Sequence, residues 1–273
     1  MNKILVPVDF SDLSHHAVEL AKELGEKLNC DVRFLHAVPV AGEVLLDTSG
    51  NLVESVSYDL EPLKKDKKEA EEKVSAIISG NERYTSSLVY GKIEQEILKE
   101  LDANQYDLLI MATHGATGLK GAVVGSHTEH IAMQSKVPVL SLKSTEHVFS
   151  DIVYASSFRT GDPPPSTVLN LIRELGGKIT FLHILEPGGE DRKAEVEQNM
   201  NKQAMVAGVH EFEKAFHSAS ELEQGLEEYC EQNKSGLLVI ESKGRRGLNQ
   251  WISGCISADL VNHYQHALLT FKF

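Results

Sequence analysis

The feature that most constrains this chain is a run of residues in its first half that recurs in its second half. Residues 107–131 read DLLIMATHGATGLKGAVVGSHTEHI, and residues 236–260 read GLLVIESKGRRGLNQWISGCISADL. The two runs align without a gap at an offset of 129 residues, and glycines kept in register indicate a duplication. The aligned glycines are Gly115, Gly118 and Gly125 in the first run and Gly244, Gly247 and Gly254 in the second.

Each copy has the pattern of a buried strand, a glycine-rich loop and the start of a helix. That order places free backbone N–H groups where a phosphate can bind. The chain therefore reads as two copies of one nucleotide-binding type of domain. Its 273 residues suffice for two domains of ordinary size. We expect domain 1 at residues 1–146 and a more degenerate domain 2 at residues 147–273.

Composition excludes several classes of protein. A net charge of −13 argues against an electrostatic grip on nucleic acid or on an anionic membrane. Cys30, Cys230 and Cys255 are too few and too scattered for a disulfide framework or a metal site, which fits a reducing cytoplasm. Asp9 interrupts the N-terminus too early for a signal peptide, and no apolar run is long enough to span a bilayer. We expect a soluble cytoplasmic protein.

Short apolar runs alternate with helical periodicity along both halves. In the first half we expect strands at 3–8, 31–38, 84–90, 108–112 and 137–142, with helices after Ser11 and at 62–78, 93–101 and 126–134. The polar segment 41–59 is predicted to be a loop or a lid. The second half repeats strands at 151–155, 179–185, 237–240 and 268–273. This alternation predicts an α/β fold with a parallel, Rossmann-like sheet in each half.

Ligands of such sheets bind beyond the carboxyl ends of the strands, where the strand order reverses. Asp9 and Gly115 follow the first and fourth strands, so both are predicted at that edge. Ser126 stands where a helix would begin and could cap it or meet a phosphate. Asp9 could accept a ribose hydroxyl or hold Mg²⁺ through water. The alternative is that the glycines and Ser126 form only a tight turn and a helix cap.

At these residues the chain resembles the universal stress protein family in its tandem-domain form. The resemblance rests on KILVPVDFS at 3–11, FLHAV at 34–38, His114-Gly115, and Gly125-Ser126 followed by Thr128. It implies two five-stranded domains of the adenine nucleotide alpha hydrolase-like fold. Many family members bind ATP, others do not, and members usually dimerise through strand five. A tandem chain can form that pair between its own two domains. Whether two such chains then form a homodimer is left open by the sequence.

The resemblance also implies a set of contacts to an adenine nucleotide such as ATP. The first loop glycine of the family falls on Ala112, a small residue that weakens the motif. By position, the implied nucleotide-binding residues are Pro7, Val8, Asp9, Ala37, Met111, Ala112, His114, Gly115, Gly125, Ser126, His127 and Thr128.

The second copy departs further from the pattern. Ser157 replaces Asp9, Glu241 replaces the first loop glycine, and Cys255 replaces Ser126. A carboxylate near a phosphate is unfavourable without a cation, although the basic residues of the second loop could still attract an anion. We therefore expect the ligand in domain 1.

No Ser-His-Asp order, paired acids or P-loop lysine appears, and the histidines lack partners for a convincing metal site. The favoured hypothesis is a non-catalytic, stress-response regulatory module that binds an adenine nucleotide, with or without Mg²⁺, and signals to an unidentified protein partner. Two alternatives stay open: a slow ATP hydrolase, and a scaffold that binds no nucleotide.

Overall fold

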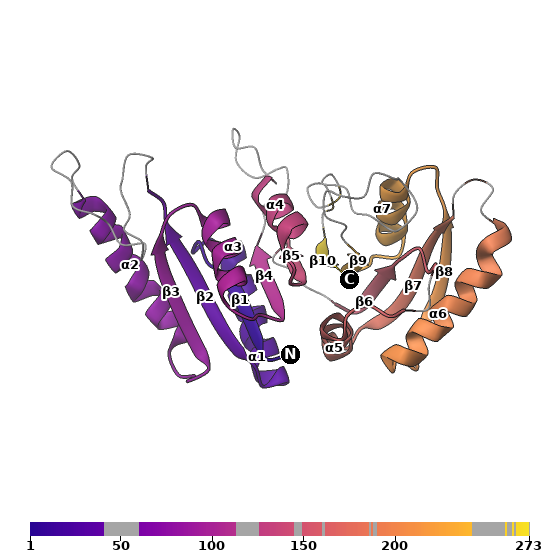
Figure 1. Cartoon of the computed structure of the whole chain (residues 1–273), viewed down its shortest axis with the longest axis horizontal. Coiled ribbons are helices and arrows are strands. Elements are labelled where there is room, and N and C mark those ends of the chain that lie inside the picture. The colour runs from indigo at the N-terminus through magenta and orange to yellow at the C-terminus, as the bar shows by residue number, and fades with distance from the viewer. Residues whose placement is uncertain are drawn as a thin grey trace. The chain divides into compact units, whose positions relative to one another are not determined.

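The computed structural model describes residues 1–40, 60–112, 126–144, 149–159, 162–185, 187, 190–241, 260, 264 and 266–272. Its contacts divide the chain into two compact units, residues 1–112 and 113–273. Strands and helices alternate in both units (Figure 1). The expected loop at 41–59 and the glycine loop of the second copy lie outside the described residues.

The first unit is a parallel four-stranded sheet with the strand order β3-β2-β1-β4. Right-handed crossovers place α1 and α2 on one face and α3 on the other, because the order reverses after β3. The elements are β1 (Lys3–Pro7), α1 (Asp12–Leu28), β2 (Asp31–Val38), α2 (Glu61–Ile78), β3 (Tyr84–Tyr90), α3 (Ile93–Ala103) and β4 (Leu108–Ala112).

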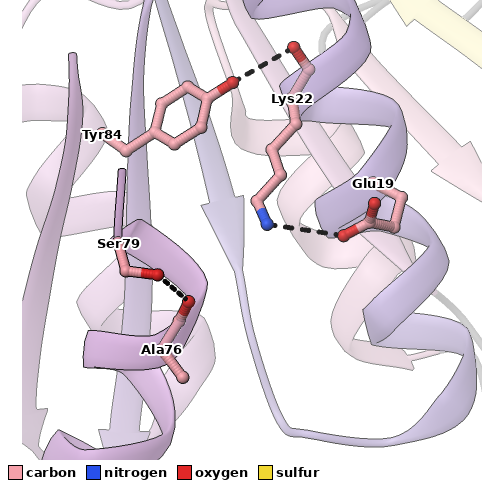
Figure 2. Close-up of polar contacts among 5 residues, drawn as sticks. All are labelled: Glu19, Lys22, Ala76, Ser79 and Tyr84. Carbon is pink, nitrogen blue, oxygen red and sulfur yellow. Dashed lines mark hydrogen bonds and ion pairs between the residues drawn. The ribbon is translucent and has the colours of Figure 1, made fainter. Parts of the chain in front are cut away.

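Local chemistry explains where these elements begin and end. Ser11 caps α1 by accepting a hydrogen bond from the Ser14 amide, and Asn29 ends the helix in the left-handed conformation. Tyr84, the first residue of β3, donates its hydroxyl hydrogen to the Lys22 carbonyl of α1 at 3.3 Å (Figure 2). Beside it, the Ser79 hydroxyl donates to the Ala76 carbonyl at the end of α2. These contacts fix the amino edge of the sheet.

The helices of the first unit differ in how much they bury. The charge-rich α2 is mostly exposed, and only Ala70 and Val74 are fully buried. The helical spacing of the apolar residues in α3 predicts four inward side chains, but only Ile97 is fully buried. Ile93, Leu98 and Leu101 are half-buried, because α3 packs chiefly against β2 and one strand covers little of a helix.

The second unit contains a complete five-stranded parallel sheet with the order β10-β9-β6-β7-β8. This confirms the predicted α/β fold, and β5 adds an antiparallel strand at β10. The elements are α4 (Ser126–Gln134), β5 (Val139–Leu142), β6 (Asp151–Ala155), α5 (Ser166–Leu175), β7 (Lys178–Leu185), η1 (Glu190–Arg192), α6 (Lys193–Ala207), β8 (Glu213–Ser218), α7 (Leu222–Gln232), β9 (Leu237–Glu241) and β10 (Ala267–Phe271).

The register of β5 with β10 is symmetric about one pair. Leu140 lies opposite Leu269, and these two leucines are equivalent by the offset of 129 residues. Ser141 pairs with Leu268 and Val139 with Thr270, so equivalent positions of the repeat lie symmetrically across the pair. Because this pairing holds α4 and β5 in the second unit, the compact units divide at 112. The repeat boundary at 146 remains a prediction.

Each predicted strand begins and ends within two residues of the observed strand. The sequence placed the start of β5 at Val137 and the end of β10 at Phe273, whereas the strands span Val139–Leu142 and Ala267–Phe271. It did not name α6, β8 or α7. Among the described helices, none combines the length and apolar character needed to cross a bilayer.

Candidate functional site

The candidate site lies at the carboxyl edge of the first sheet. Strand β1 has β2 on one side and β4 on the other, so the order reverses at β1 and β4. In open α/β sheets this reversal leaves a crevice beyond the carboxyl ends of the strands. Extending the strand register past Pro7 brings Val8 level with Ala112 and Asp9 level with Ala37. Four predicted site residues therefore meet at one edge.

Asp9 is exposed and is held by the first turn of α1. Its Oδ1 accepts hydrogen bonds from the Ser11 amide at 2.9 Å and from the Ser11 hydroxyl at 2.7 Å. The Asp9 amide donates to the Ser14 hydroxyl at 3.2 Å. The carboxylate thus stands at the amino-terminal, positive end of α1. Ser11 therefore both caps α1 and orients Asp9, a second role that the sequence did not predict.

The remaining predicted residues of the first unit supply backbone and small side chains. Pro7 ends β1, and Val8 continues the ladder by donating its amide hydrogen to the Leu35 carbonyl at 2.8 Å. Ala37 and Met111 are 7% and 6% exposed, so their side chains pack into the core. Contacts from these two positions to a ligand would therefore come chiefly from main-chain atoms.

Two further residues at this edge were not predicted as site residues. The imidazole Nδ1 of His36 lies 2.6 Å from the Val8 carbonyl oxygen, and the ring of Phe10 lies 4.6 Å from that of His36. Phe10 has a φ of 63°, in the left-handed region. The FLH triplet at residues 34–36 recurs at residues 181–183, but this repetition assigns no role to His36 and does not point to Phe10.

The phosphate side of the predicted site is described only in part. Helix α4 spans the predicted residues Ser126–Gln134, and Thr128 is 7% exposed. This helix belongs to the second compact unit. The side chains of Ser126 and His127 lie outside the description, as do His114, Gly115 and Gly125 altogether. Their predicted roles in holding phosphate stay predictions.

The corresponding edge of the second unit carries different side chains, among them a buried phenylalanine. Phe158 is 1% exposed and stacks on Phe181 with ring centroids 5.6 Å apart. The buried Asn199 amide donates to the Phe158 carbonyl at 2.8 Å. Ser157 and Glu241 stand where the first copy has Asp9 and Ala112. This edge therefore lacks the carboxylate and carries an added acid at the end of β9.

The part of the chain that the structure describes contains no group of three histidine, cysteine or acidic side chains arranged to hold a metal ion. Cys30 and Cys230 are buried free thiols. Burial raises the pKa of Cys230 to about 11, so this thiol is inert at neutral pH.

A family model for the universal stress proteins matches residues 1–143. The chain belongs to the universal stress protein family. Universal stress protein MJ0531 of Methanocaldococcus jannaschii is 30% identical over 144 residues, which cover 52% of this chain and 81% of the relative. Universal stress protein MJ0577 of the same organism is 29% identical over 162 residues, and this match covers 52% of this chain and 94% of the relative.

A solved structure extends the likeness in fold to the whole chain. The universal stress protein from Archaeoglobus fulgidus is 17% identical, with a TM-score of 0.70, and the match covers 99% of this chain and 98% of that one. The two relatives from Methanocaldococcus jannaschii match only half of this universal stress protein, whereas the Archaeoglobus fulgidus structure matches both halves. The tandem arrangement of two universal stress protein folds follows from that difference.

Proposed function

We propose that this universal stress protein binds an adenine nucleotide at the carboxyl edge of its first sheet and acts as a regulatory module in the stress response. The observation that carries the proposal is the position of Asp9. Its exposed carboxylate stands where the strand order reverses, beside the ends of β2 and β4. A carboxylate at that place can accept the hydroxyl hydrogens of a ribose.

The other predicted contacts complete the site from the sequence. Pro7 and Val8 would line the ribose and adenine side, and main-chain atoms of Ala37 would meet the base. The loop from Ala112 through His114 and Gly115 to Gly125 would offer N–H groups to the phosphates, with Ser126, His127 and Thr128 at the start of α4. Asp9 also suits Mg²⁺ held through water, because that ion keeps several waters and binds carboxylates.

Regulation by binding is favoured over turnover, because the sequence carries neither a P-loop lysine nor a Ser-His-Asp order. We propose that bound nucleotide alters a surface that a protein partner reads. The second copy would serve as a pseudo-symmetric partner, because Ser157 stands in place of Asp9 and Glu241 adds an acid at its edge.

The decisive experiment is titration of the nucleotide-free full chain with ATP and Mg²⁺ by calorimetry. The double variant Gly115→Val with Gly125→Val should lose more than about tenfold in affinity, which is about 1.4 kcal/mol. The matched control, Gly244→Val with Gly254→Val, changes the aligned glycines of the second copy and should bind as the wild type does. Unchanged affinity in the first variant would remove the proposed site.

A further inference from the structure

The loop that carries Asp9 adopts a conformation that its sequence disfavours. Phe10 has a φ of 63°, a value that a bulky side chain rarely adopts because its Cβ crowds the backbone. Such a conformation persists only where the surrounding contacts enforce it. The contacts around Phe10 and Val8 therefore show what holds Asp9 in place.

His36 holds this loop on both sides of Asp9. Its Nδ1 lies 2.6 Å from the Val8 carbonyl oxygen, and its ring packs against the Phe10 ring at 4.6 Å and 39°. A carbonyl oxygen only accepts hydrogen bonds, so Nδ1 must carry the hydrogen. The ammonium of Lys73 lies 5.1 Å from the Phe10 ring centroid and adds a cation–π contact from α2.

We propose that His36 is a positioning residue for the nucleotide site: it clamps the Val8–Phe10 turn and so fixes where the Asp9 carboxylate stands. This inference rests on the proposed function, because the clamp affects binding only if a nucleotide contacts Asp9. His36 itself points to the α2 side and acts through Val8 and Phe10. It is a strand residue 27 positions away from Asp9, so the clamp also ties the loop to β2.

The second unit repeats the clamp in a loosened form. His183 Nδ1 lies 3.1 Å from the Ser156 carbonyl, and Phe158 has a φ of 46°. The Phe158 ring, however, is 6.4 Å from His183 and stacks on Phe181 instead. Ser157 stands in place of Asp9. The second copy therefore offers a control in which the same histidine contact supports no carboxylate.

Three full-length variants test the clamp. His36→Leu removes the donor, His36→Asn keeps an N–H close to the position of Nδ1, and His183→Leu removes the equivalent donor of the second unit. Each is titrated with ATP and Mg²⁺, and amide hydrogen exchange is followed at Val8, Asp9 and Ser11. In the wild type, the ¹⁵N signals of the His36 ring should show the tautomer with hydrogen on Nδ1.

We expect His36→Leu to bind ATP about tenfold more weakly and to exchange these amides faster, since it leaves a carbonyl without its donor. His36→Asn should restore affinity to within about threefold, and His183→Leu should leave affinity and exchange at residues 8–11 unchanged. If His36→Leu leaves the exchange rates as they are, or if both leucine variants weaken ATP binding equally, the clamp is wrong. If the wild type binds no ATP while His36→Leu speeds exchange, the clamp stands and the proposed nucleotide function fails.

Discussion

Single residues of this protein show how burial changes the chemistry of a charged group. Lys143 follows β5 and is half-buried beside α7. Desolvation by burial lowers the pKa of its ammonium to about 8, against a weaker opposing effect of Glu227. The folded protein therefore binds fewer protons than the unfolded chain between about pH 8 and 10.5. Below that window the buried ammonium lowers the free energy of unfolding, and this destabilisation decreases as the pH rises through the window.

Replacing Lys143 with methionine keeps the apolar stem and removes the charge. We expect Lys143→Met to raise the free energy of unfolding at pH 7 by less than about 1 kcal/mol, because solvent screens part of the effect. The gain should shrink at pH 10. Urea denaturation at both pH values measures it, with the exposed Lys65→Met as a control that should show no such trend. A less stable variant at pH 7 would mean that ion pairing outweighs desolvation at this site.

Strands β5 and β10 show how an element can carry the symmetry of a duplication. Leu140 and Leu269 face each other at the centre of the pair, and both are fully buried. Ser141 and Thr270, also equivalent by the repeat, are buried as well. A symmetric register gives the two leucines matching surroundings along the pair, so equal substitutions should have nearly equal costs.

Truncation of the central leucines tests this symmetry. Leu140→Ala and Leu269→Ala should each cost about 2–5 kcal/mol of stability, and the two values should be similar. The double variant should depart from additivity by more than about 0.5 kcal/mol, since the side chains are neighbours. Leu140→Ala combined with Leu182→Ala in β7 should instead be additive in urea denaturation. Unequal single costs would argue that the flanking residues, not the register, determine the packing.

The elements that the sequence predicted well are those with short, uninterrupted apolar runs. Strand β1, with Ile4, Leu5 and Val6 fully buried, follows directly from such a run. Helix α6 was missed because its buried face includes Asn199 and Gln203, so polar residues interrupt the apolar periodicity. The edge strand β8 reads EKAFHS, which lacks a continuous apolar run.

The site shows the same division. Asp9 could be predicted because it directly follows a buried strand, where a ligand edge is expected. The role of His36 could not be predicted, because its contact with the Val8 carbonyl forms only when a loop 28 residues away folds onto the strand. Spacing along the chain reports contacts within one element, whereas the clamp joins two.

At the scale of the whole molecule, the two copies have the same fold but different edges. The first edge presents the exposed carboxylate of Asp9, whereas the second has Ser157 at the equivalent position. This difference predicts one nucleotide per chain. It also separates three hypotheses, because a binding module, a slow hydrolase and a scaffold differ in occupancy and turnover.

Thermal unfolding with ATP and Mg²⁺ tests the whole-molecule prediction. At a hundred times its Kd, ATP should add about 2.7 kcal/mol to the stability of the state that binds it and raise the melting temperature. Native mass spectrometry should count one nucleotide per chain. Two nucleotides would assign a ligand to the second edge as well, and none would favour the scaffold. Release of phosphate that Asp9→Ala abolishes would favour the hydrolase.

The symmetric pairing of β5 with β10 has a consequence for how this chain can change over generations. In a homodimer of identical subunits, every substitution appears on both sides of the pair. Here the two equivalent strands are encoded separately, and their partner is always present at a fixed effective concentration that dilution does not reduce. One copy can therefore lose its acid, as at Ser157, while the other keeps Asp9. Because both copies lie in one chain, the strand pair can stay symmetric while the ligand edges of the two copies differ in sequence.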